Sequence, residues 1–203
     1  TDPYDDPESN YLDPPVWARL NPATRVLMSA HNTLLGRMIL GPPIGTLVFW
    51  RDEIGRLARR ESGVARAWAL HLAGVALVGV WLATVSQVAV WQYLAACWLA
   101  LSLLRIRTFA EHRAHERHGA RSVIIEDRGP LSLLFLNNNF HAVHHAHPKL
   151  PWYRLPGRYE AQRDVFLKRN GGYRYGSYRE LFVRYLLRRK DPVPHPLRAG
   201  PRA

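Results

Sequence analysis

The sequence predicts an all-α integral membrane protein, in which a transmembrane helical hairpin is joined to interfacial helices and a cytoplasmic, histidine-rich helical cap. Two observations predict this fold. Residues 67–104 contain no aspartate, glutamate, lysine or arginine. His141, His144 and His145 are spaced at i, i+3 and i+4, which would place three imidazoles on one face of a helix.

A single helix over the uncharged run would be about 57 Å long at 1.5 Å per residue, nearly twice the thickness of the hydrocarbon core. The chain must therefore turn back, and its most polar stretch, 84–87, predicts the turn. We expect two spans, near 67–84 and 88–105, in a transmembrane hairpin at 67–105. Arginines flank the hairpin on both sides, and positive residues beside spans stay cytoplasmic. Both of its ends are therefore expected to face the cytoplasm.

Two segments precede the hairpin. Residues 1–20 are acidic and rich in proline without apolar periodicity, which predicts an extended loop. Residues 21–66 are expected to form an amphipathic, interfacial segment, because a helix start at Asn21-Pro22 is followed by apolar residues at helical spacing. Gly41-Pro-Pro43 should end that helix.

Residues 106–190 are predicted to form the cytoplasmic metal-site and cap region, and residues 191–203 a disordered tail. We expect helices at 105–119, 160–169 and 178–189. On the first of these, His112 and His115 would share a face. Since this histidine group and the one at 141–145 should lie at the same depth outside the membrane, we expect them to converge.

Convergent neutral imidazoles can bind zinc, copper, iron or nickel. A chain with a single cysteine and no His-Glu-x-x-His motif fits neither a zinc finger nor the common zinc hydrolases, although a three-histidine zinc site stays open. Iron explains more, because an oxygen-activating centre at the membrane surface could reach an acyl chain held in the bilayer.

The net charge of +12 indicates an acidic partner or surface, either nucleic acid or anionic headgroups of the lipid bilayer. The charges form no recognisable nucleic-acid motif, so we expect no nucleic-acid partner. A non-enzymatic, basic membrane-associated protein is the alternative that this charge leaves open.

Three segments resemble the membrane fatty acid desaturase family. His141-Ala-Val-His-His145, followed by a His-Pro pair and by Pro151-Trp-Tyr-Arg-Leu-Pro156, resembles the third histidine box of the family. Arg107-Thr-Phe-Ala-Glu-His112 is similar to its additional ligand segment, and TDPYDDPESNYL to the stretch after its second box. The resemblance implies two iron ions held by eight or nine histidines, with O2 as co-substrate and an electron donor such as a ferredoxin or cytochrome.

The resemblance assigns four residues as metal ligands and catalytic residues, namely His112, His141, His144 and His145. His115 is the runner-up ligand, while Asn138 and Glu111 would orient a ligand or a bound water. The implied function is desaturation of an acyl-lipid or acyl-carrier substrate in the bacterial plasma membrane, with a fatty acid or carotenoid hydroxylase or ketolase as the alternative. The first two histidine boxes of the family are absent from these residues, so we expect a truncated polypeptide that is inactive alone.

Overall fold

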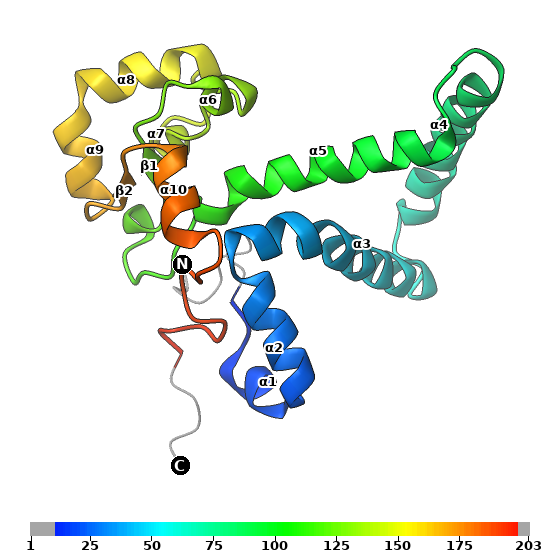
Figure 1. Ribbon diagram of the computed structural model, residues 1–203, viewed down its shortest axis with the longest axis horizontal. Coiled ribbons are helices and arrows are strands. Elements are labelled where there is room, and N and C mark those ends of the chain that lie inside the picture. The colour runs from blue at the N-terminus through cyan, green and yellow to red at the C-terminus, as the bar shows by residue number, and fades with distance from the viewer. Residues whose placement is uncertain (1–10, 199–203) are drawn as a thin grey trace. The chain divides into compact units, whose positions relative to one another are not determined.

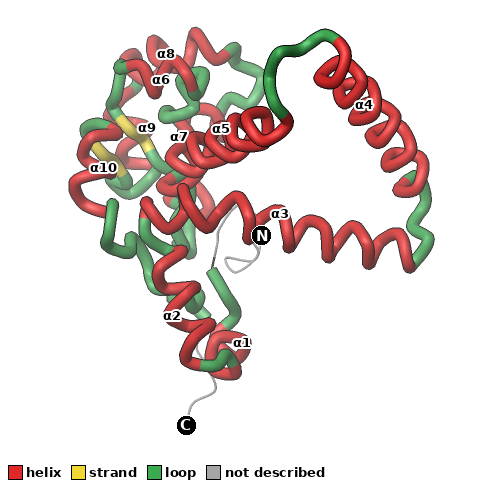
Figure 2. The backbone as a smooth tube through the Cα atoms, turned by 45° about the vertical axis from the view of Figure 1, so that its right-hand side comes forward, coloured by secondary structure: helices red, strands yellow, loops and turns green. Residues whose placement is uncertain are grey.

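The computed structural model describes residues 11–198. These residues are mostly helical, as predicted, and belong to two compact units. The site unit contains the described residues 11–38 and 104–198, and the long-helix unit contains residues 39–103. Figure 1 labels the helices and strands, and Figure 2 colours the chain by secondary structure.

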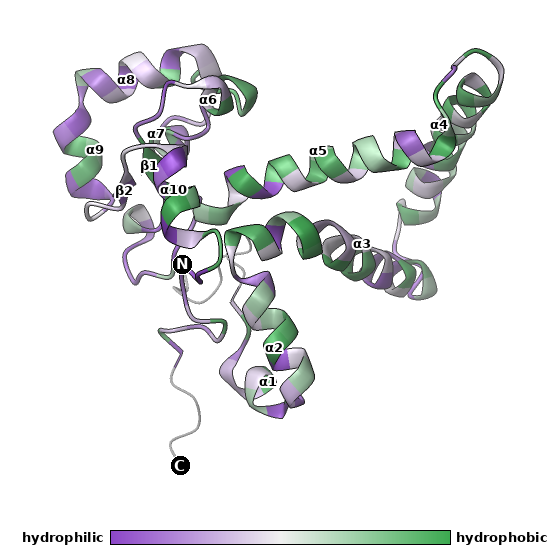
Figure 3. Ribbon diagram, in the orientation of Figure 1, coloured by the Kyte–Doolittle hydropathy of each residue, from purple (hydrophilic) through white to green (hydrophobic). Residues whose placement is uncertain are grey.

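The long-helix unit contains α4 (Val64–Thr84) and most of α5 (Val90–Ala110). Each helix has 21 residues and is apolar enough to cross a membrane, and a length of about 31 Å matches the hydrocarbon core. Figure 3 shows hydrophobic residues along most of both helices. Large side chains such as Leu77 and Trp91 are 73% and 70% exposed. The prediction of two long apolar helices is confirmed, and the residues that connect them are 85–89.

α3 (Leu34–Ala58) begins in the site unit and continues into the long-helix unit. The prediction of one helix from Asn21-Pro22 to Gly41-Pro-Pro43 is wrong in two respects. The chain leaves the helix at residues 32–33, and α3 then passes through both prolines. The fixed φ of proline is itself helical, but each proline loses the hydrogen bond to the carbonyl four residues earlier and its ring crowds that carbonyl. Gly41 and Pro42 are buried, and packing in the folded chain routinely overrides the local preference of a residue.

Two short helices, α1 (Pro14–Arg19) and α2 (Pro22–His31), precede α3. α2 begins where predicted, because the Asn21 side chain accepts a hydrogen bond of 2.8 Å from the backbone N–H of Thr24. The prediction of an extended loop over residues 1–20 is wrong at α1, and residues 1–10 lie outside the described part of the chain.

The rest of the site unit consists of short elements. They are β1 (Ile124–Ile125), α6 (Pro130–Leu134), α7 (His141–Ala146), α8 (Leu155–Ala161), α9 (Arg163–Arg169), β2 (Arg174–Tyr175) and α10 (Tyr178–Tyr185), with 3-10 turns at His118–Ala120 and Trp152–Arg154. β1 and β2 pair in parallel, with Ile124 opposite Arg174 and Ile125 opposite Tyr175. Strands of two residues carry too little pattern for sequence analysis to predict, so the all-α prediction missed them.

β1 lies between two hydrophobic clusters. Successive side chains of a strand point to opposite faces, and Ile125 packs in a cluster with the end of α5 and with α10. Ile124 packs in the other cluster, against residues of α7, α8 and α9 such as Val143 and Phe166. The strand therefore joins the end of α5 to the histidine-bearing helix α7.

The helix predicted at 105–119 is wrong beyond Ala110, where α5 ends. The N–H of Val123 donates to the carbonyl of Glu111, and the N–H of Arg113 donates to the carbonyl of Arg121, both at 3.0 Å. These bonds pair the chain in an antiparallel bridge and replace the helical bonds. His112 consequently lies in extended backbone.

The two helices predicted near the carboxyl end are also shorter than expected. The one at 160–169 is divided between α8 and α9, where Gln162 has a φ of −139°, and the one at 178–189 ends at Tyr185. The predicted disordered tail is wrong for its described part, 191–198. The backbone N–H of His195 donates to the carbonyl of Leu12 at 2.8 Å, and the His195 side chain is buried.

Candidate metal centre

Three of the predicted histidines converge in the site unit and are called the histidine trio below: His112, His141 and His145. His112 follows α5, whereas the other two lie one helical turn apart on α7. The Nε2 atom of His141 lies 2.8 Å from that of His112 and 3.0 Å from that of His145. One nitrogen from each of the three rings lies within 4.8 Å of the others.

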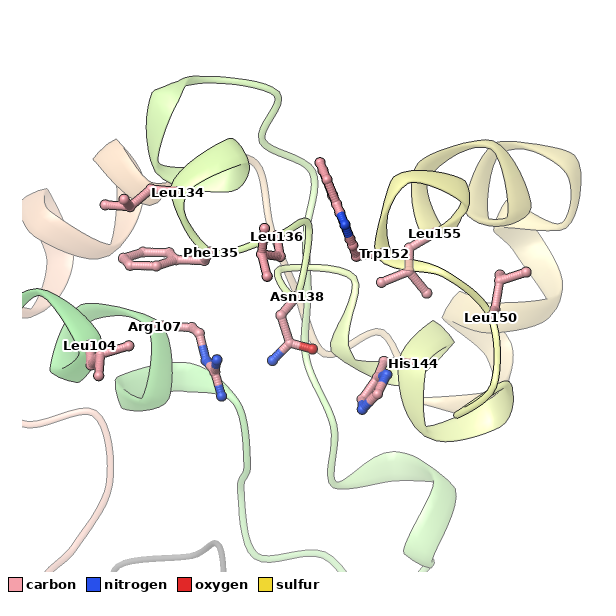
Figure 4. A pocket seen from close by; sticks show the side chains of 10 residues that line it. All are labelled: Leu104, Arg107, Leu134, Phe135, Leu136, Asn138, His144, Leu150, Trp152 and Leu155. Atoms are coloured by element: carbon pink, nitrogen blue, oxygen red, sulfur yellow. The ribbon is translucent and has the colours of Figure 1, made fainter. Parts of the chain in front are cut away.

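His144 lies beside the trio but is not part of it. Its ring centroid is 6.0 Å from that of His141 and 5.9 Å from that of His145. Positions i and i+4 of a helix differ by about 40° around its axis, whereas i+3 lies about 60° to the other side. The side chain of His144 instead lines a cavity next to Asn138 (Figure 4).

The structure does not bring His115 to the trio. The shared face with His112 required a helix, and the chain is extended there. The Nδ1 atom of His115 accepts a hydrogen bond of 3.0 Å from the backbone N–H of Arg117. His118, in the following 3-10 turn, is exposed.

Glu111 contacts the opposite side of the His141 ring. Its Oε1 atom lies 3.8 Å from Nδ1 of His141. The same oxygen accepts hydrogen bonds from Nε of Arg107 at 2.9 Å and from Nδ2 of Asn138 at 2.6 Å. Burial raises the pKa of the Glu111 carboxyl, and the charge of Arg107 opposes this shift. The carboxyl group is thus held in place behind a histidine by Arg107 and Asn138.

The consecutive asparagines before α7 have separate roles. Asn137 adopts the left-handed conformation with a φ of 52°, which asparagine tolerates better than most residues. Asn138 contacts Glu111, whereas Asn139 is buried and donates to the carbonyls of Ile125 and Asp127 at 2.7 and 3.1 Å. Asn139 therefore fastens the start of α7 to β1.

Sequence reasoning missed Asn139 and Arg107. The Asn139 contact depends on long-range folding and has no local signal. The i, i+4 spacing of Arg107 and Glu111 was a readable sign of their ion pair.

The histidine trio has the electrostatics of a cation site. Burial, and then the neighbouring imidazoles of His112 and His145, lower the pKa of His141 to about 2. His141 is therefore neutral at physiological pH, and neutral imidazole is the form that binds metals. A tautomer with its proton on Nδ1 would face Glu111 and leave the Nε2 lone pair directed at the other two rings. This donor set fits one divalent metal ion.

A cavity of about 440 Å³ lies next to these residues. Figure 4 shows three polar side chains, Arg107, Asn138 and His144, along one side of it. The other lining residues are apolar, namely Leu104, Leu134, Phe135, Leu136, Leu150, Trp152 and Leu155. The cavity could therefore accept an apolar group beside the histidines.

The model of one protein family, described as Fatty acid desaturase, matches residues 1–177 of the chain. The chain belongs to the fatty acid desaturase family. The resemblance read from the histidine box is thereby confirmed, and family membership together with α4 and α5 indicates a membrane protein. Members of this family typically use a di-iron centre. In this chain, the histidine trio could hold a metal ion.

A 43-residue stretch of this family member is 54% identical to a beta-carotene ketolase of Paracoccus sp. (strain PC1). The matched stretch covers 20% of this chain and 17% of the ketolase. No solved structure matches the chain. The relative belongs to the same superfamily of oxidoreductases, which includes desaturases and hydroxylases.

Proposed function

We propose that this protein acts as a fatty acid desaturase, which uses O2 to oxidise a C–H bond of an acyl chain at a histidine-ligated di-iron centre. The observation that carries the proposal is the convergence of three imidazoles beside an apolar cavity, in a chain of this family. Neutral imidazole ligands suit iron, and the apolar lining suits an acyl chain.

The chain's own residues would divide the work as follows. His112, His141 and His145 would hold one iron, and His144 would be available to a second. The bound iron pair would supply the activation of O2 that an unactivated C–H bond requires. Glu111 would keep His141 oriented through its Nδ1 atom, since an acceptor behind a ligand fixes the ring and its tautomer. Leucines and Trp152 would exclude water from the cavity.

We further propose that α4 and α5 form a transmembrane hairpin, which places the histidine trio at the cytoplasmic face of a bacterial plasma membrane. The arginines on both sides of the two helices support this orientation. The substrate would be an acyl-lipid or acyl-carrier molecule, and the two electrons would come from a ferredoxin or a cytochrome.

The second candidate is a carotenoid ketolase. The observation that favours it is the 43-residue similarity to the beta-carotene ketolase. A carotenoid is also a long apolar molecule, so the apolar lining of the cavity suits both substrate classes.

Expression of the full-length gene in a bacterial host that makes both fatty acids and carotenoids tests the two candidates. Lipid analysis should show new acyl double bonds with the wild type and with His118→Ala, which changes an exposed histidine outside the trio. The His145→Ala variant should produce none. Ketocarotenoids without new double bonds would select the ketolase, and unchanged lipids and carotenoids in every culture would reject both. Iron analysis of the purified protein distinguishes both candidates from a zinc site.

A further inference from the structure

The backbone of His112 is held by a lysine from far along the chain. The ammonium Nζ of Lys190 donates a hydrogen bond of 2.7 Å to the carbonyl oxygen of His112. The same Nζ lies 3.0 Å from the hydroxyl of Tyr173 and 2.8 Å from the carboxylate of Asp191. An ammonium group has three N–H donors, so these three acceptors use all of them. The side chain of Lys190 is only 9% exposed.

Tyr173 extends this hydrogen-bonded chain to the end of α5. Its hydroxyl donates to the carbonyl of Ala110 at 2.6 Å, one of the carbonyls that a helix end leaves without a helical partner. Arg113 lies over the Tyr173 ring, at 4.4 Å from its centroid. The backbone carbonyls of Ala110 and His112 are therefore both fixed by one pair, the largely buried Lys190 and the buried Tyr173.

The segment that carries Lys190 is itself tied to the site unit. The side-chain Nδ2 of Asn32 donates to the carbonyl of Asp191 at 2.8 Å. Thr33 and Arg189 form an antiparallel bridge. Lys190 is thus presented from a fixed backbone, and holding a long side chain there costs less conformational entropy than it would on a mobile tail.

We propose that Lys190 is a positioning residue for the histidine trio: its ammonium fixes the backbone of His112, so that the imidazole of His112 meets those of His141 and His145. This inference rests on the proposed role of the trio as a metal site. Lys190 lies beyond residues 1–177, which match the family model. The carboxyl-terminal segment therefore completes a metal centre whose ligands all lie within the matched part.

The physical reason lies in the extended backbone at His112. Outside a helix, the direction of a side chain depends on the hydrogen bonds of its own peptide groups. Methionine in place of Lys190 would keep the length of the side chain but remove the ammonium that donates to the carbonyl of His112. The His112 backbone could then rotate away from α7.

Cobalt(II) titration of the purified full-length protein tests the proposal, with the visible ligand-field absorption as the readout. Lys190→Met should weaken cobalt binding by about 10- to 100-fold, the range typical for residues that support metal ligands, and should reduce the ligand-field intensity. Tyr173→Phe keeps the packed ring and should weaken binding in the same direction but less. Lys168→Met, at an exposed lysine of α9, is the matched control and should bind cobalt like the wild type.

A double-mutant cycle separates positioning from general stability. In a His112→Ala background, Lys190→Met should cause no further loss of cobalt affinity, because the ligand that it positions is gone. Undiminished cobalt binding by Lys190→Met, or an equal loss in both backgrounds, would overturn the proposal. If His112→Ala itself leaves cobalt binding unchanged, both the proposed metal site and this inference are refuted. If cobalt binding behaves as expected but lipids and carotenoids stay unchanged, only the proposed reaction fails.

Discussion

Replacing Glu111 by glutamine removes a charge from the metal centre with little change of shape. The glutamine carbonyl can still accept the hydrogen bonds from Arg107 and Asn138 that the carboxylate accepts now. Only the negative charge beside Nδ1 of His141 is lost. A carboxylate in that position makes the imidazole a stronger metal ligand, so we expect Glu111→Gln to weaken metal binding.

The magnitude follows from the distance of 3.8 Å between Oε1 of Glu111 and Nδ1 of His141. Two unit charges at that separation attract by about 4 kcal/mol at an effective dielectric constant of about 20. Only part of the charge of a bound metal ion reaches Nδ1, and the guanidinium of Arg107 opposes the carboxylate. If about one third of the full attraction of about 4 kcal/mol acts on the bound ion, the contribution of the carboxylate is roughly 1.4 kcal/mol, which corresponds to a tenfold change in metal affinity.

Cobalt(II) titration of the purified protein measures this change. Glu160→Gln serves as the matched control, because Glu160 lies on α8 and pairs with Arg128 at the surface. The control should bind cobalt with the affinity of the wild type. If Glu111→Gln also binds like the wild type, the carboxylate does not support His141 and the electrostatic reasoning is refuted.

Three further predictions concern the packing behind α7, and unfolding of the purified protein measures each. Asn139→Ala should cost about 1–3 kcal/mol, because the buried carbonyl of Ile125 loses its donor, whereas the carbonyl of Asp127 keeps its hydrogen bond from the Ser132 hydroxyl; an unchanged unfolding midpoint would contradict this. Val143→Ala, at a fully buried position of α7, should cost about 2 kcal/mol through the cavity it leaves, and no loss would mean that the helix repacks. Burial would raise the pKa of Glu126, but two half-exposed arginines and a tyrosine hydroxyl bind its carboxylate and together lower the pKa from 4.5 to about 2. Glu126→Gln should therefore cost about 1–2 kcal/mol at neutral pH after solvent screening. Because the native pKa is lowered, the difference should persist down to about pH 4.5 and disappear toward pH 2, and a difference independent of pH would contradict the ion pairs.

Local patterns in the sequence were sufficient for the parts of the fold that depend on neighbouring residues. The uncharged run predicted α4 and α5 because hydrophobicity over about 20 residues is a local property. The start of α2 could be predicted from the sequence because its N-cap residue, Asn21, bonds to a backbone N–H within the first helical turn. The continuation of α3 through Pro42 and Pro43 could not be predicted, since proline disfavours a helix locally and packing around the buried Pro42 overrides that local preference.

The candidate site was predictable in its residue types but only partly in its geometry. The spacing on α7 predicted that His141, His144 and His145 share a face; His141 and His145 meet in the trio, whereas the ring of His144 lies to one side. The placement of His144 beside the trio follows from its angular position on α7, whereas the placement of His115 outside it depends on where α5 ends. That end is fixed by residues 121–123, which pair with the backbone at 111–113. Neither Lys190 nor Asn139 could be assigned from sequence, because each acts on a residue or strand distant in the chain.

Val123 shows how the fold closes the gap of 29 residues between His112 and His141. Its backbone N–H donates to the carbonyl of Glu111, and its own carbonyl accepts from the N–H of Ala142, both at 3.0 Å. The fully buried Val123 therefore bonds to Glu111, the residue before His112, and to Ala142, the residue after His141. Because both bonds belong to the same residue, the separation of the two imidazoles is set by backbone geometry. The long-range hydrogen bonds of Val123 thus bring the backbones of the two histidine motifs together.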